Sequence, residues 1–315
     1  MRPPCVFPVR AGAAVDRAGR SVRPGPVRYV SHQRRLVLMK SAKAFVLPLI
    51  VPLLFLLLWH VMAQVVRNDI ILPDIPLVWD IMVSPHEDLI SMGTLPANTL
   101  ISLARVFAGY FVAVVLAIPL GIVMGYRPDV NTALSTFLGL FRSIPPLAWV
   151  PLVLAWFGML SLADVFSVPI GPAYPYFHNI KISMIFIIFI GGFYPVLTSA
   201  IHGVGLVPQT LTDAARVLGA NQVDIFRKVL LPYAAPSIIN GLRIGLGVSW
   251  MCLVSAEMLP GSLSGVGYLI THAYTVGRTD VVIAGMISIG LVGAVLDRIF
   301  RLYEDRKFVW KRLTK

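Results

Sequence analysis

The chain has 315 residues, of which 57% are hydrophobic and only 13% are charged. A soluble globular domain is about a quarter charged, so this chain lacks the polar residues needed to cover a surface that faces water. The formal net charge of +12 could suggest nucleic-acid binding, but the basic residues stand in tails and short loops beside apolar segments, which indicates membrane topology. The two cysteines, Cys5 and Cys252, lie far apart and predict no disulfide framework, zinc site or thiol-redox motif.

Residues 1–43 are predicted to form a basic, disordered cytoplasmic tail. The first 35 residues hold eight arginines, five prolines and a single acid, Asp16, with no periodic apolar pattern. An organellar transit peptide is one alternative for such an arginine-rich segment. Another is that translation begins at Met39, where a basic start precedes an apolar run.

Six segments are apolar over the roughly 20 residues needed to cross the hydrocarbon core of a bilayer. The first is too long and too rich in proline for a cleaved signal, and it is predicted to be an anchor. Together the six form a transmembrane domain over residues 44–300, followed by a basic cytoplasmic tail over 301–315. The predicted spans are 44–66, 100–124, 133–157, 180–200, 238–259 and 281–300.

The distribution of Lys and Arg predicts the orientation of these spans. With the N-terminus inside, both tails, the loop at Arg127 and the 201–237 loop fall on one side and hold most of the 27 Lys and Arg residues. Positive residues mark the cytoplasmic side of a membrane protein. The sequence therefore predicts a multi-pass protein of the cell (inner or plasma) membrane with both termini in the cytoplasm.

One polar stretch interrupts the apolar pattern, in a predicted cytoplasmic loop over 205–232. Its sequence, TDAARVLGANQVDIFRKVLLP, predicts two amphipathic helices with a turn at Gly219, because glycine tolerates a left-handed backbone. Thr212 or Gln209 is expected to cap the first helix, and Pro232 is expected to end the second. A surface helix in the headgroup layer is the alternative. The small, nearly uncharged face of the first helix favours docking into a groove of another protein.

This loop resembles the EAA loop of the permease subunits of binding-protein-dependent ABC importers. That pattern is Glu-Ala-Ala, three residues, Gly, nine residues, Ile, one residue and Leu-Pro. Segments 141–158, 240–259 and 264–273 resemble the nitrate/sulfonate/taurine/bicarbonate branch, and 161–179 looks like an insertion in the outward loop where a binding protein would dock. At the spacings of the EAA pattern the chain has Asp213-Ala214-Ala215, Gly219, Val229 and Leu231-Pro232, with Asp for Glu and Val for Ile.

The resemblance implies an all-α polytopic membrane protein, type I ABC importer permease-like, with six transmembrane helices and a cytoplasmic coupling helix. It also implies a homodimer of permease subunits, two ATP-binding subunits and an external solute-binding protein. The chain lacks a phosphate-loop motif, so it is expected to be no enzyme and to bind no cofactor, with ATP and Mg²⁺ held by the partner subunit. The resemblance assigns coupling to Thr212, Asp213, Ala214, Ala215, Leu218, Gly219, Ala220, Asn221 and Pro232.

The solute implied by the resemblance is a small anion such as nitrate, sulfonate, taurine or bicarbonate. A permease of the same family for a vitamin precursor stays an alternative. A secondary transporter driven by an ion gradient would need inverted repeats, which the halves 44–158 and 180–300 do not show. The histidines have no metal-ligand spacing, and no metal site is predicted. No sequence pattern of a folded nucleic-acid-binding domain stands beside the basic tail. The chain is therefore expected to contact the lipid bilayer and not nucleic acid.

Ionisable side chains at membrane depth are costly and are candidates for function. Arg142 precedes Pro145 and Pro146, which would break the third span beside a cavity. Arg142 either faces the translocation pathway and favours anions, or it snorkels toward the headgroups.

The second and fifth spans hold the remaining pathway or gate candidates. Glu257 is expected to pair with Arg105 near the outer ends of these spans, either as a structural pair or as a gate. Snorkelling, or pairing with the coupling region, is expected of Arg243. Ser249, Trp250 and Ser255 lie along the fifth span.

Overall fold

The computed structural model describes residues 49–84, 88–171, 174–258 and 262–307. Within these ranges the regular structure is helical, and the single β pairing is an isolated antiparallel bridge between Ser161 and Lys181. The predicted tail over 1–43 lies outside the described residues. The last helix runs to Lys307, so the predicted C-terminal tail over 301–315 begins inside a helix.

Five helices are long and apolar enough to cross a membrane, and the six-span prediction is met if one bent pair counts as a sixth. The bent pair is α4 with the short 3₁₀ turn (Pro146–Trp149) and α5 (Val150–Phe157) that follow it, and its two parts meet at 84°. The break falls at the predicted proline pair, Pro145-Pro146, because proline cannot donate the hydrogen bond that continues a helix. The five helices are Leu49–Val66, α3 (Leu95–Tyr126), α8 (Ile182–Gly205), Gln222–Glu257 and α13 (Thr279–Lys307), and the bent pair joins α4 (Pro128–Arg142) to Pro146–Phe157.

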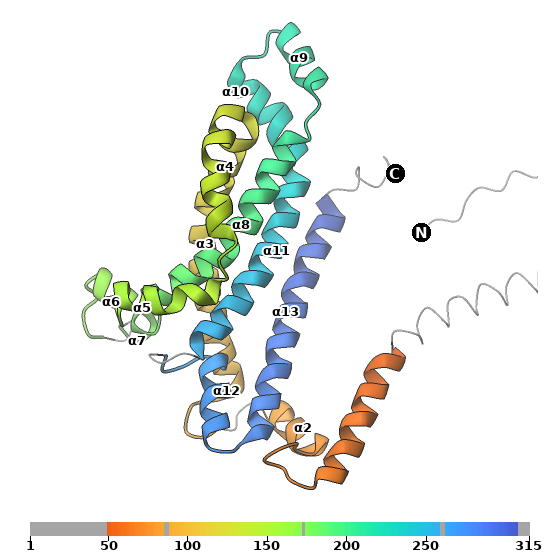
Figure 1. The fold of residues 1–315 in the computed structure, drawn as a ribbon, viewed down its shortest axis with the longest axis vertical. Helices are drawn as coiled ribbons and strands as arrows, with labels where there is room; N and C mark the ends of the chain where they lie inside the picture. The colour runs from red at the N-terminus through yellow and green to blue at the C-terminus, as the bar shows by residue number, and fades with distance from the viewer. Residues whose placement is uncertain (1–48, 85–87, 172–173, 259–261, 308–315) are drawn as a thin grey trace, which may run out of the picture. The chain divides into compact units, whose positions relative to one another are not determined.

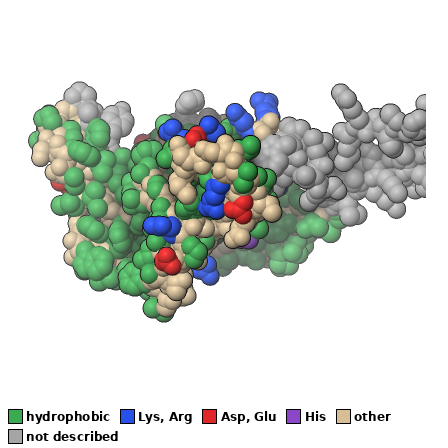
Figure 2. Space-filling model, turned by 90° about the horizontal axis from the view of Figure 1, so that it is seen from above, with side chains coloured by type: hydrophobic (Ala, Val, Ile, Leu, Met, Phe, Trp, Pro, Cys, Tyr) green, Lys and Arg blue, Asp and Glu red, His purple; other side chains and the backbone are tan. Residues whose placement is uncertain are grey.

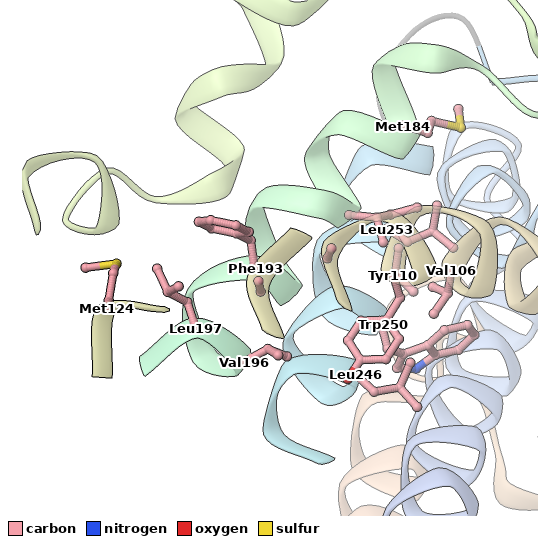
Figure 3. Close-up of a cluster of buried hydrophobic side chains, with 14 residues drawn as sticks. Val106, Tyr110, Met124, Met184, Phe193, Val196, Leu197, Leu246, Trp250 and Leu253 are labelled. Carbon is pink, nitrogen blue, oxygen red and sulfur yellow. The ribbon is translucent and has the colours of Figure 1, made fainter. Parts of the chain in front are cut away.

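The core of the bundle is α8 packed between α3 and α11 (Leu231–Glu257), as Figure 1 shows. Apolar side chains of the three helices form one buried cluster, which includes Tyr110 from α3, Phe193 from α8 and Trp250 from α11 (Figure 3). The indole N–H of Trp250 donates to the carbonyl of Ile289, which ties α11 to α13.

Glycines let these helix backbones approach one another. A Cβ added at Gly121 of α3 would lie 2.6 Å from the Cβ of Ala200 on α8, and one added at Gly241 of α11 would lie 2.3 Å from the Cβ of Ser199. The small-residue spacings at 121/125 and 241/245 therefore serve packing against α8 from its two sides.

The prediction that Pro232 ends a helix is wrong. The chain runs without a break from α10 (Gln222–Ile225) through a π turn (Phe226–Leu230) into α11, and Pro232 lies in the first turn of α11. In the π turn the N–H of Leu231 donates to the carbonyl of Phe226. The wider π turn shifts the hydrogen-bond pattern just before Pro232, which has no N–H to donate. The helix therefore continues through the proline.

Five short helices complete the described chain. α2 packs against α13, and α12 against α11 and α13. α6 and α7 belong to the outward-loop insertion predicted over 161–179, and α9 to the predicted coupling loop. Their bounds are α2 Ile75–Val83, α6 Leu162–Val165, α7 Tyr174–His178, α9 Gln209–Val217 and α12 Val266–Thr275.

Candidate coupling loop and charged network

The loop between α8 and α11 stands at one end of the bundle, here called the loop end (Figure 1). It holds α9, a turn and α10. Gly219 has φ +82°, the left-handed conformation that was predicted for it. The N–H of Ala220 donates to the carbonyl of Ala215 at 3.0 Å, and the N–H of Gly219 to that of Arg216 at 2.9 Å. These two bonds form a Schellman motif, so the stop after α9 is a built turn.

The helix caps of the loop differ in part from the prediction. α9 begins at Gln209 after Pro208, and no side chain caps it. The hydroxyl of Thr212 instead donates back to the carbonyl of Gln209 at 2.7 Å. α10 does have a cap, because the side-chain oxygen of Asn221 accepts from the N–H of Asp224 at 2.8 Å.

Apolar side chains of this polar loop are exposed. Val217 is 88% exposed and Leu218 is 86% exposed, while Ala215 and Ala220 pack against the apolar cluster at the base of the loop. Figure 2, seen onto this end, shows the exposed hydrophobic side chains among Lys, Arg, Asp and Glu. Nothing lies within 4 Å of a Cβ placed at Gly219. The loop thus presents an apolar tip with open space around its turn.

The charges of the loop pair locally and at the surface. Arg216 contacts Asp213 at 2.9 Å and Lys228 contacts Asp224 at 2.7 Å, within one helical turn in each case. A pocket of about 520 Å³ separates α9 from the ends of α3 and α8, and Arg127 and Thr212 line it. Exposed pairs of this kind contribute only about 0–1 kcal/mol, so they hold the loop weakly.

The opposite end of the bundle, here called the network end, carries a buried ion pair. Arg105 Nη1 lies 2.7 Å from Glu257 Oε1, and the two side chains are 1% and 0% exposed. The predicted pairing of these residues is confirmed. The Glu257 carboxylate also accepts from the hydroxyl of Ser102 at 2.8 Å and from the N–H of Gly267 at 3.1 Å. The charge is therefore fully hydrogen-bonded inside the protein.

The rest of the network was not foreseen from the sequence. Arg105 also donates to the carbonyl of Ser264 at 2.7 Å and to its hydroxyl at 2.8 Å. Asn98 accepts from the N–H of Gly265 at 2.8 Å. Asn98, Ser102 and Arg105 are spaced by four and three residues, which puts them on one face of α3. This polar stripe in an apolar span was the sequence signal that would have revealed the network.

The described residues between α5 and α8 form a small lobe beside the charged network. Ser161 caps α6 in a capping box with Asp164, and the bridge to Lys181 closes the base. Hydrogen bonds from the hydroxyl and backbone N–H of Ser161 lower the pKa of Asp164, whereas desolvation lowers the pKa of Lys181. Arg105 Nε donates to the carbonyl of Asn179 at 2.8 Å, so the lobe is joined to the charged network.

The predicted pathway residues fall into two groups. Arg142 ends α4 and is exposed, and with Pro146 it lines a pocket of about 290 Å³ against α8, while Pro145 stands in the break itself. Ser255 is partly exposed and bonds to the carbonyl of Met251.

The second group makes contacts inside the bundle, and it consists of Ser249, Trp250 and Arg243. The hydroxyl of Ser249 donates to the carbonyl of Ile188 on α8, and Trp250 is buried. Arg243 was expected to snorkel or to pair with the coupling region, but its ion pairs are with α13. It lies 3.6 Å from Asp297 and 3.8 Å from Glu304, because α13 extends past it along α11. Among the described residues, no group of three His, Cys, Asp or Glu side chains is arranged to hold a metal ion.

Residues 117–309 match the family described as binding-protein-dependent transport system inner membrane component. A Methanocaldococcus jannaschii protein, provisionally named an ABC transporter permease, is 45% identical over 91% of this chain and 100% of its own length. The taurine transport system permease protein of Escherichia coli is 37% identical over 66% of this chain and 68% of its own.

Two further comparisons agree with these matches. The bicarbonate transport system permease protein of Synechococcus elongatus is 34% identical over 64% of this chain and 65% of its own. An inward-facing structure of the MetNI methionine ABC transporter has a chain with TM-score 0.52 and 21% identity, covering 69% of this chain and 98% of that one. The structural match speaks for the fold alone.

Proposed function

Since this chain belongs to the family of inner membrane components of binding-protein-dependent transport systems, we propose that it is the coupling permease of an ATP-driven anion importer. It is a multi-pass membrane protein with the type I importer permease fold. The loop over 205–232 is the part that converts the work of a partner into movement of the spans. The observation that carries this proposal is the apolar, exposed tip of α9 at Val217 and Leu218.

The bundle does not cover the apolar tip of the loop, so a groove in another protein would suit it. Exposed Val217 and Leu218 stand at the end of α9, whose other face rests on the bundle through Ala215. Aliphatic side chains left in water favour burial by a partner, each by about 1.5–3 kcal/mol when fully covered. A groove of an ATP-binding subunit that seats this tip would grip the loop by its shape, with Asp213 and Arg216 at the rim.

The assembly that we infer contains two copies of this permease, two ATP-binding subunits and an external binding protein. ATP and Mg²⁺ belong to the ATP-binding subunits, because this chain has no phosphate-loop motif. The loop end faces the cytoplasm in this proposal, and so do both termini, in agreement with the bias of Lys and Arg in the sequence. The network end then faces the binding protein.

The proposed solute is a small anion. Relatives that are 34–37% identical are named for taurine, nitrate and bicarbonate, which share an oxyanion group. The pair of Arg105 and Glu257 fastens α3 to α11 at the network end, and we propose that it holds the outer gate closed in the resting state. Asn179 connects the lobe over 161–179 to this pair, which offers a route from the docked binding protein to the gate.

Replacing Gly219 by leucine tests the coupling role. The φ of +82° strains any side chain there, and leucine also fills the open space that the partner groove would occupy. We expect Gly219→Leu to lower ATP-driven anion uptake in proteoliposomes at least tenfold, while membrane insertion and dimer content stay unchanged. Gly290→Leu is the matched control, because a Cβ at Gly290 also meets nothing within 4 Å. Unaffected uptake in the Gly219 variant would overturn the assignment.

A further inference from the structure

An open pocket lies between the break in the α4–α5 span and α8. It has a volume of about 290 Å³. Arg142 is the last residue of the 15-residue helix α4, so it lies roughly 21 Å along that helix. Tyr194 and Thr198 face it from the middle of the 24-residue helix α8, with Tyr194 roughly 18 Å from its first residue. Tyr194 thus lies near the middle of a helix that is long and apolar enough to cross a hydrocarbon core about 30 Å thick, and Arg142 lines the same pocket.

Among the residues that the structure describes, Arg142 is the one charged side chain that lines this pocket. It is exposed, and it makes no hydrogen bond or ion pair with a residue that the structure describes. Arginines near helix ends can snorkel to the headgroups, but a residue at the centre of a span cannot reach them. An unpaired guanidinium at this depth therefore requires water or an anion on its open side.

The rest of the lining supports an oxyanion beside this guanidinium. The hydroxyl of Thr198 donates to the carbonyl of Tyr194 at 2.9 Å, so its proton is used within α8. The phenol of Tyr194 has no such bond among the described residues and can donate into the pocket. Arginine presents a planar fork of N–H donors that matches two oxygens of one oxyanion. The pocket thus combines a fixed positive charge with a neutral donor, and its described lining holds no carboxylate that would repel an anion.

The geometry points to a mid-membrane anion contact site, formed by the Arg142 guanidinium and the Tyr194 phenol, through which the solute passes. This inference rests on the proposed anion import, and it adds a site within the permease itself. The binding protein sets the concentration at which the solute is captured, so this site acts on transit after delivery. Its loss lowers the maximal uptake rate and leaves the half-saturating concentration nearly unchanged.

The test uses the full complex in proteoliposomes with its binding protein, and it measures uptake of taurine, nitrate and bicarbonate separately. For the anion that wild type imports, we expect Arg142→Gln to lower the maximal rate about 10- to 100-fold, the equivalent of one charged hydrogen-bond partner. Arg142→Lys should keep a larger share of the rate, and Tyr194→Phe should lose severalfold. Arg306→Gln is the control, an exposed arginine at the far end of α13.

Chemical rescue separates a charge requirement from a shape requirement. Arg142→Cys is made in a chain with Cys5→Ser and Cys252→Ser, whose own uptake must equal that of wild type. Thiosulfonate reagents then attach either an ammonium group or a neutral methyl group to the new thiol. The ammonium adduct should restore at least a third of the lost uptake, and the methyl adduct should restore none.

Three outcomes would overturn the inference. They are an unchanged rate in Arg142→Gln, equal rescue by both reagents, and an equal loss of uptake and of ATP hydrolysis together with loss of assembly. The last would show that Arg142 only holds the fold. Failure of the wild-type complex to import with ATP would instead overturn the proposed function, which makes the two failures distinguishable.

Discussion

The two ends of the bundle differ in where their ion pairs lie, buried at one end and at the surface at the other. At the network end, Arg105 and Glu257 are buried, and hydrogen bonds from Ser102 and Gly267 satisfy the carboxylate from within the chain. At the loop end, Asp213 and Arg216 pair at the surface beside exposed apolar side chains. A region whose polar groups are satisfied internally needs no partner to be stable. A region with an apolar tip and weak surface pairs leaves apolar area in the open, which the proposed partner would cover.

The largest effect is expected from the network end. Arg105→Ala leaves the Glu257 carboxylate buried without its countercharge, which should lower the free energy of unfolding by about 3–5 kcal/mol. Thermal and denaturant unfolding in nanodiscs measure this loss. Arg216→Ala removes the exposed pair at the loop end and should change it by no more than about 1 kcal/mol. Equal losses in the two variants would break the comparison between the ends.

The two ends also contain matched glycines with a left-handed backbone. Gly265→Ala at the network end would set a Cβ 2.3 Å from Glu257 Oε1 at φ +110°, so the carboxylate must move. We expect a loss of about 2–5 kcal/mol from strain and overpacking together. Gly219→Ala meets no atom and should lose about 1–2 kcal/mol from strain alone.

The two glycine variants should rank in opposite orders by stability and by uptake. Gly265→Ala should lower the unfolding midpoint more, whereas Gly219→Ala should lower ATP-driven uptake more than its stability predicts. If uptake follows stability alone in both variants, the loop turn has no special part in coupling.

The smallest effect is expected at Asp213. Asp213→Asn removes half of a surface pair and should change the free energy of unfolding by about 0.5 kcal/mol or less. If the carboxylate lies at the rim of a partner groove, the same change should weaken binding of the ATP-binding subunit about two- to fivefold. Asp213→Glu keeps the charge and should bind as tightly as the natural residue. If Asp213→Asn binds the ATP-binding subunit as tightly as the natural chain does, the groove recognises the shape of the loop and not its charge.

Local features of single segments were predictable from the sequence. The apolar runs revealed the spans, and Gly219 revealed its turn because few other residues adopt a left-handed backbone. The acid and the base near the same ends of two spans revealed the pair of Arg105 and Glu257. The spans and the turn follow from costs within one segment, and the pair follows from the cost of an unpaired charge at membrane depth, so none of them required the packing of the helices.

Features that depend on neighbouring helices were not predictable. Pro232 breaks hydrogen bonding by its own chemistry, yet a π turn two residues earlier accommodates it. Arg243 was expected near the coupling region, but the length of α13 decides that Asp297 lies beside it. The partners Ser264 and Gly265 come from a loop whose position only the packed fold sets. For Arg243, Arg105 and Asn98 the deciding contact comes from another element, and for Pro232 it comes from the preceding turn of the same helix.

The unbroken helix over Gln222–Glu257 has a mechanical consequence. Its 36 residues measure roughly 54 Å, and they connect the turn at Asn221 to the carboxylate of Glu257. Such a helix behaves as a lever: a tilt of about 5° applied at one end displaces the other by roughly 5 Å over this length. A shift of that size exceeds the 2.7 Å contact of Glu257 with Arg105. A force that tilts the loop end of this helix therefore also strains the Arg105–Glu257 ion pair at its other end.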